Sequence, residues 1–136
     1  MRTLEEMRSL ARNDARSGEV QTLARSVPDP YALDNWLRYT WSIVPDPPHA
    51  EFVRAPSYMI RSGRFEGDCD DAATLAASVL TALGYPVLLV AVRMPTDPEF
   101  SHVFARVPFR PPLDIDPIVP AEHLPIRYGE AMVLVV

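Results

Sequence analysis

The stretch "GRFEGDCDDAATLAASVLTALGYP", residues 63–86, decides the fold. Asp68 is a good helix N-cap, and no Gly or Pro interrupts residues 70–83. Gly84 stands where a left-handed C-cap belongs, and Pro86 follows just beyond it. These signals predict a helix over residues 70–83, with the cysteine at its start.

Two stripes of side chains run along this predicted helix. One is apolar and is headed by the cysteine: Cys69, Ala73, Ala76 and Leu80. The other is polar: Asp70, Thr74, Ser78 and Thr81. Residues at these spacings share a helix face, so we expect the apolar stripe to pack on a sheet and the polar one to point elsewhere. Solvation then accounts for Asp70 and Asp71.

The strongest strand signals follow this helix. Alternating or continuous apolar runs predict strands at residues 87–94, 101–107, 113–116 and 131–136. The first of these runs is nearly all apolar, which indicates a strand buried on both faces. Helices first and strands second predict an α+β fold with a mostly antiparallel sheet.

The first 43 residues have helical spacing. Thr3 and Asp29 are N-cap candidates, and Pro30 suits a first helical position. The tryptophans, Tyr31 and Tyr39 are expected in the core of this helical part. The prolines between 44 and 56 predict an ordered surface loop, and residues 57–61 fit either a helix or an extended piece.

Composition bounds the function. With 136 residues, 48% of them hydrophobic, and a net charge of −5, the chain is long enough for one core and poorly suited to general nucleic-acid binding. No run approaches the roughly 20 apolar residues of a membrane span, and the start lacks a signal-peptide pattern. One cysteine excludes an internal disulfide and a Cys-rich zinc site. We expect a soluble protein made inside the cell.

Cys69 is the chain's only thiol and lies among three carboxylates. The macrodipole at a helix start favours the thiolate by about 0.3–1 kcal/mol, which is too little to make a strong nucleophile. A reactive thiol therefore needs a basic partner. The alternative is an inert packing residue, since free cysteine is among the most buried residue types.

His102 is the candidate base, on the predicted strand "SHVFARV". An imidazole that takes a thiol proton needs an acceptor that fixes its tautomer. Asp114 and Asp116 are candidates, and both point to the same face of an extended strand, so spacing alone does not separate them.

"GDCDDAATLAASVLTALGYP", then "HVF", then "LDIDP" resembles the transglutaminase-like branch of the papain-type cysteine enzymes, over about residues 44–118. "DPPHAEFVRAPSYMI" is similar to the lead-in of small bacterial and phage members. The resemblance implies a papain/transglutaminase-like core. It predicts one such domain over residues 1–136, with a helical part (1–43) and a helix-plus-sheet core (44–136).

The resemblance also implies roles for individual residues. Cys69 is the nucleophile, His102 is the general base and then the acid, and Asp116 is the orienting carboxylate. Asp116 is preferred because Pro117 follows it, as in the family's pattern, and Asp114 is the alternative third member.

The oxyanion site and substrate pocket are less well marked. Phe104 stands where the family usually has Trp, and no upstream Gln or Trp is identifiable as a second oxyanion donor. The main-chain N–H of Cys69 is one candidate donor, with Tyr58 or Trp41 as the other.

The function implied is thiol-dependent acyl transfer on an amide, with hydrolysis of a peptide or isopeptide bond favoured over transfer. The alternative is a phage tail or head protein that keeps the fold with little or no activity. The expected partners are a protein or peptide substrate and, for the alternative, phage structural proteins or a second copy. That copy would join by strand addition through "MVLVV".

Nucleic acid, membrane and cofactor are not expected. The carboxylates of "GDCDD" lack the spacing and central Gly of an EF-hand loop, so no metal site is predicted. The expected location is the cytoplasm or a phage particle.

Overall fold

The central helix of the computed structural model, which describes residues 3–45, 54–120 and 128–136, is α5 (Cys69–Leu83). The Asp68 side chain accepts hydrogen bonds from the main-chain N–H groups of Asp70 and Asp71. At the other end, Gly84 has a φ of 88°, the left-handed conformation expected of a C-cap glycine. The helix predicted from the sequence is confirmed to within one residue.

In the described part of the chain, four further helices precede α5: α1 (Leu4–Asp14), α2 (Gly18–Ser26), α3 (Pro30–Thr40) and α4 (Pro56–Ser62). Thr3, Ser17 and Asp29 cap the first three through their side-chain oxygens. Residues 57–61, for which the sequence left a helix and an extended conformation open, are helical and belong to α4. The loop predicted over 44–56 lies mostly outside the described residues.

A four-stranded antiparallel sheet follows, in the order β5-β4-β3-β6. Its strands match the four predicted runs closely: β3 (Leu88–Arg93), β4 (His102–Val107), β5 (Leu113–Ile115) and β6 (Glu130–Val135). The α+β expectation is confirmed. A second, two-stranded parallel sheet, β1 (Ser42–Ile43) with β2 (Glu66–Gly67), was not predicted.

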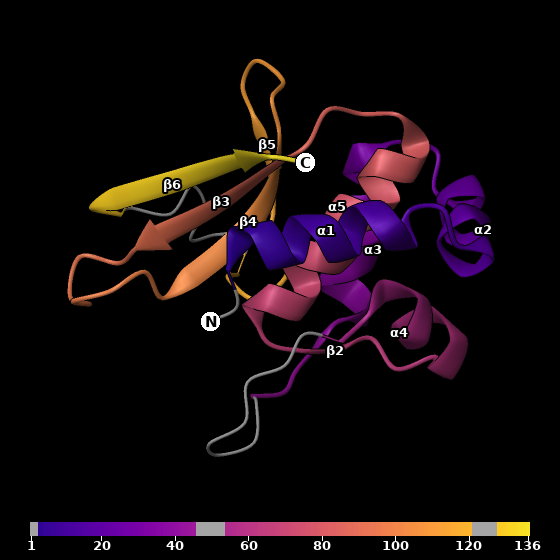
Figure 1. Cartoon of the computed structure of the whole chain (residues 1–136), viewed down its shortest axis with the longest axis horizontal. Helices are drawn as coiled ribbons and strands as arrows, with labels where there is room; N and C mark the ends of the chain where they lie inside the picture. Colours follow the sequence, from indigo (N-terminus) through magenta and orange to yellow (C-terminus); the bar gives the residue numbers. More distant parts are fainter. Residues whose placement is uncertain (1–2, 46–53, 121–127) are drawn as a thin grey trace.

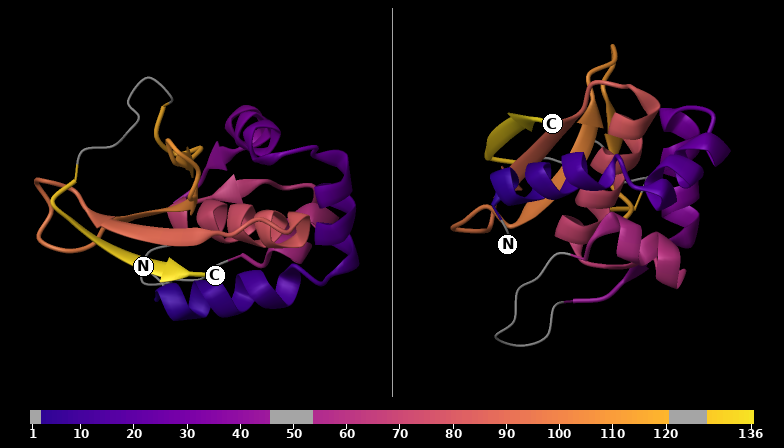
Figure 2. Two further views of the ribbon diagram at one scale, coloured as in Figure 1. Left: turned by 90° about the horizontal axis from the view of Figure 1, so that it is seen from above. Right: turned by 45° about the vertical axis from the view of Figure 1, so that its right-hand side comes forward.

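The helices gather on one side of the sheet, and α5 lies between them and β4 (Figures 1 and 2). Alternate residues of the strands turn toward α5, so Leu89, Val103 and Ile115 share one core with Leu75 and Val79. The opposite face of the sheet carries a smaller cluster of Val90, Val92 and Phe104. This arrangement sets the N-terminus of α5 beside the sheet.

The polar stripe of α5 is buried as well, and the expectation that solvation accounts for Asp70 is wrong. Asp70, Thr74 and Ser78 are all buried. α1 packs against α5, and the Ser78 hydroxyl donates to the Ala11 carbonyl oxygen at 3.0 Å. The Thr74 hydroxyl donates to the Asp70 carbonyl oxygen at 2.7 Å. Because these Ser and Thr hydroxyls donate hydrogen bonds to main-chain carbonyl oxygens, their side chains can be buried, and the helix can be packed on every side.

The aromatic residues of the helical part fall into two groups, buried and exposed. Trp41 is buried, and Trp36 packs edge-on against Phe65 with ring centroids 4.8 Å apart. Tyr31 and Tyr39 are 56% and 95% exposed, so the expectation that they lie in the core is wrong. Among the residues that the structure describes, no helix has both the length and the apolar character that crossing a bilayer requires.

Candidate active site

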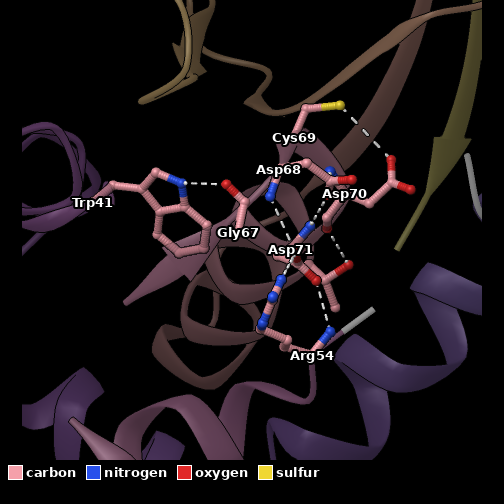
Figure 3. Close-up of polar contacts among 8 residues, drawn as sticks. Trp41, Arg54, Gly67, Asp68, Cys69, Asp70 and Asp71 are labelled. Carbon is pink, nitrogen blue, oxygen red and sulfur yellow. Dashed lines mark hydrogen bonds and ion pairs between the residues drawn. The ribbon is translucent and has the colours of Figure 1, made fainter. Parts of the chain in front are cut away.

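The start of α5 is fixed by a buried carboxylate, that of Asp71 (Figure 3). One oxygen, Oδ2, accepts from the Asp68 main-chain N–H at 3.1 Å, which completes a capping box. The same oxygen accepts from the Arg54 guanidinium at 2.8 Å, and Oδ1 accepts from the Arg54 main-chain N–H at 2.6 Å. The chain at Arg54 is therefore tied to the helix start, and the expectation that Asp71 is solvated is wrong.

Gly67, the residue before the N-cap Asp68, is held by hydrogen bonds from a distant part of the chain. The Gly67 carbonyl oxygen accepts from the Trp41 indole N–H at 3.3 Å and from the Val44 main-chain N–H at 2.9 Å. Gly67 has a φ of 145°, and a Cβ there would overlap the Asp71 carboxylate. Only glycine fits this close approach, which brings β2 onto the start of α5.

Cys69 sits on the far side of this helix start from Arg54, and its sulfur lies 3.8 Å from Asp70 Oδ1 (Figure 3). Burial, and then the Asp70 carboxylate, raise the pKa of the thiol to about 12, although the Val103 main-chain N–H that donates to the sulfur favours the thiolate. Desolvation and the adjacent charge outweigh the macrodipole.

His102 and Asp116 form a buried pair, with Nε2 and Oδ2 2.5 Å apart. An ionised carboxylate only accepts, so Nε2 donates in this bond, and in a neutral ring Nδ1 then keeps its lone pair. Asp116 Oδ1 in turn accepts from the main-chain N–H groups of Ile118 and Val119, at 3.2 and 3.4 Å. The carboxylate is thus fixed by the turn that follows β5.

Asp114 is engaged elsewhere. The register of β4 and β5 sets it opposite Arg106, and the guanidinium donates to both carboxylate oxygens at 2.6 and 3.1 Å. Two residues along the same face, Asp116 reaches His102 instead. The structure therefore brings Asp116, and not Asp114, to the imidazole.

The Cys69 thiol contacts the beginning of β4. Val103, which donates its N–H to the Cys69 sulfur, directly follows His102 in the chain. Within the described part of the chain, no hydrogen bond joins this sulfur to the imidazole. Cys69 and the buried pair are therefore neighbours across the α5–β4 contact without a direct bond between them.

No hydrogen bond joins the other predicted site residues to the thiol within the described part of the chain. The indole N–H of Trp41 is engaged by Gly67, so it is not available as an oxyanion donor. Tyr58 is 55% exposed on α4. Phe104 is buried on the far face of the sheet, 6.0 Å between ring centroids from His102. The main-chain N–H of Cys69 donates to no other described residue.

Two residues of this region were missed from the sequence as parts of the site, Arg54 and the buried Asp70. Asp68 and Asp71 have the three-residue spacing of a capping box, which was a usable signal for the helix start. Nothing in the sequence pointed to Arg54, because it lies 17 residues before its partner in a proline-rich segment.

No protein-family model matches this chain, and neither does any curated protein. The structure is similar to solved structures of Legionella pneumophila LapG, a transglutaminase-like cysteine protease. One of these has a TM-score of 0.53 and 18% identity, and the match covers 88% of this chain and 75% of LapG. The chain has a transglutaminase-like fold.

Two other LapG structures give similar matches. The EGTA-treated form has a TM-score of 0.53 and 18% identity, with 92% of this chain and 78% of LapG covered. The calcium-bound form has a TM-score of 0.51 and 19% identity, with 91% and 80% covered. At these identities the likeness concerns the fold.

Proposed function

We propose that this protein catalyses thiol-dependent acyl transfer on an amide, with hydrolysis of a peptide or isopeptide bond as the reaction. Cys69 is the nucleophile, His102 is the general base, and Asp116 orients the imidazole. The observation that carries the proposal is the buried 2.5 Å hydrogen bond from His102 Nε2 to Asp116. This bond leaves Nδ1 as the proton acceptor, and His102 directly precedes Val103, whose main-chain N–H donates to the Cys69 sulfur.

The high pKa of Cys69 determines how the first step proceeds. A thiol with a pKa of about 12 is neutral at neutral pH, so no preformed thiolate attacks. His102 Nδ1 takes the proton as the sulfur bonds to the substrate carbonyl carbon, which requires the thiol and the ring to come within hydrogen-bond reach of each other. The imidazolium that forms is stabilised by the Asp116 carboxylate.

The remaining steps return the protein to its starting state. The Cys69 main-chain N–H, in the first turn of α5, donates to the oxyanion of the tetrahedral intermediate. His102 then gives its proton to the leaving amine as the carbon–nitrogen bond breaks, which leaves a thioester. His102 takes a proton from water as the water oxygen attacks the thioester carbon, and it gives that proton to the Cys69 sulfur as the carbon–sulfur bond breaks, so the acid product is released and the free thiol is restored.

One of the LapG structures is calcium-bound. Within the described residues, no group of three or more His, Cys, Asp or Glu side chains is placed to hold one. The carboxylates of Asp68 and Asp71 are already engaged by main-chain N–H groups, and that of Asp71 also by Arg54. These residues do not fit a metal ion in this arrangement, and no step above involves one.

An activated acyl ester tests the proposal without a known substrate. With p-nitrophenyl acetate, the native protein should form an acetyl thioester at Cys69, detected by intact mass, and release nitrophenol over several turnovers. His102→Ala should slow acylation by roughly 10²-fold or more, the usual contribution of a general base. Acylation that is no faster in the native protein than in His102→Ala, both folded, would overturn the proposal.

A second candidate is a structural part of a phage tail or head that keeps the fold without the activity. Two observations favour it: the neutral, largely buried thiol, and the exposed apolar side chains of β6. The same acylation experiment separates the two, because a purely structural protein has no catalysed acylation to lose.

A further inference from the structure

The strand β6 forms one edge of the four-stranded sheet and pairs only with β3 among the described residues. Five of its six residues are exposed, including Met132, Val133 and Val135 at 48%, 53% and 62%. Between Ala131 and Val136 there is no charge and no proline. Natural sheets usually protect such an edge with Lys, Pro, a bulge or a covering segment.

The pairing with β3 fixes which main-chain groups of β6 point outward. The Val136 N–H donates to the Val87 carbonyl oxygen at 2.9 Å, in line with the β3–β6 register. Antiparallel pairing alternates between bonded and non-bonded positions. Residues 134 and 132 therefore bond toward β3, and the N–H and C=O groups of Ala131, Val133 and Val135 point away from the sheet.

We propose that this edge binds a second copy of the same chain, with two β6 strands antiparallel about a two-fold axis at Val133. In this register Val133 faces Val133, and Ala131 faces Val135 of the other copy. The three outward-pointing residues of each strand then pair with one another, which gives about six main-chain hydrogen bonds. The two sheets join into one, and their helices lie on the same side.

The charge distribution of β6 is compatible with a second copy of the chain as the binding partner. The strand's one charged residue, Glu130, lies at its beginning, 3.7 Å from Arg93 of the same chain. In the antiparallel pair the two Glu130 residues lie at opposite ends, about 20 Å apart, so they do not repel across the axis. Every directly opposed pair between 131 and 135 is apolar. A parallel arrangement would instead set the two Glu130 side chains beside each other.

Sedimentation velocity of the full chain tests the proposal. The native protein should show a concentration-dependent dimer. Val133→Glu and Val133→Lys should each be folded monomers, with the dissociation constant raised at least about tenfold, because residue 133 opposes itself. Mixing the two variants should restore a dimer. Tyr39→Glu and Tyr39→Lys, at a 95% exposed position on α3, are the matched controls and should leave the dimer unchanged.

A disulfide tests the register. In the Cys69→Ala background, Val133→Cys should form a linked dimer under mild oxidation, since bonded antiparallel pairs have Cα atoms about 5.5 Å apart. Met132→Cys, which opposes Leu134, should link poorly. A native protein that stays monomeric at millimolar concentration would overturn self-pairing. A dimer that survives Val133→Glu, or links better through Met132→Cys, would overturn it equally.

Discussion

Replacing Asp70 by Asn should make the Cys69 thiol more reactive. After burial, the Asp70 carboxylate is the largest cause of the raised pKa of Cys69. Its Oδ1 atom lies 3.8 Å from the sulfur, and the side chain is 2% exposed. Asn has nearly the same shape, so the substitution removes the charge and leaves the packing of α5 in place.

The size of the effect follows from Coulomb's law. At this separation two unit charges interact by about 1 kcal/mol at the dielectric constant of water, and by about 4 kcal/mol at an effective dielectric constant of 20. Each 1.36 kcal/mol corresponds to one pKa unit. The lower limit is about 0.8 units, so the thiolate fraction near pH 8 should rise at least roughly sixfold.

Alkylation by iodoacetamide, followed by intact mass across pH, measures this directly, because Cys69 is the only cysteine in the chain. The native protein should react more slowly than free cysteine below pH 9, and Asp70→Asn should react faster than the native protein. Glu5→Gln removes one exposed charge on α1 and should leave the rate unchanged. A native rate that levels off below pH 9, or an Asp70→Asn variant that is no faster than native, would refute the electrostatic reasoning.

Two predictions concern the helix start and are measured by denaturant unfolding. Arg54→Met leaves the buried Asp71 carboxylate without its guanidinium and should cost about 3 kcal/mol of unfolding free energy. Arg61→Met, at an exposed pair 4.0 Å long, should cost less than about 0.5 kcal/mol, and equal costs would contradict the argument. Gly67→Ala adds a clash with Asp71 to the strain of a positive φ, so it should cost at least about 2 kcal/mol. Gly63→Ala has the strain without the clash, and a cost as large as that of Gly67→Ala would show that the close approach is unimportant.

The elements that the sequence predicted are those whose signals are local. α5 has an N-cap at Asp68, a C-cap at Gly84 and no breaker between them, so its bounds follow from neighbouring residues. The strands follow in the same way from short apolar runs. The pair β1–β2 has two residues in each strand, which is too short for any periodicity to appear.

The candidate site depends on contacts between distant segments, and these were only partly predictable. Asp114 and Asp116 are two residues apart, so an extended chain sets them on the same face, and the choice between them depends on the pairing of Arg106 with Asp114. The burial of Asp70 depends on the packing of other elements around α5. A pattern of one apolar and one polar stripe describes a helix with a single buried face, and α5 is buried on several.

The tautomer of His102 tests the central claim most directly. In the proposed mechanism the imidazole is neutral, with its proton on Nε2, toward Asp116, and a free lone pair on Nδ1 that receives the thiol proton. Nitrogen-15 NMR of the native protein distinguishes the two ring nitrogens, and loss of the signals in His102→Asn assigns them among the three histidines. A protonated Nε2 with an unprotonated Nδ1 near neutral pH is the predicted result. A neutral ring protonated on Nδ1 would contradict the account, because that nitrogen could not then accept a proton from Cys69.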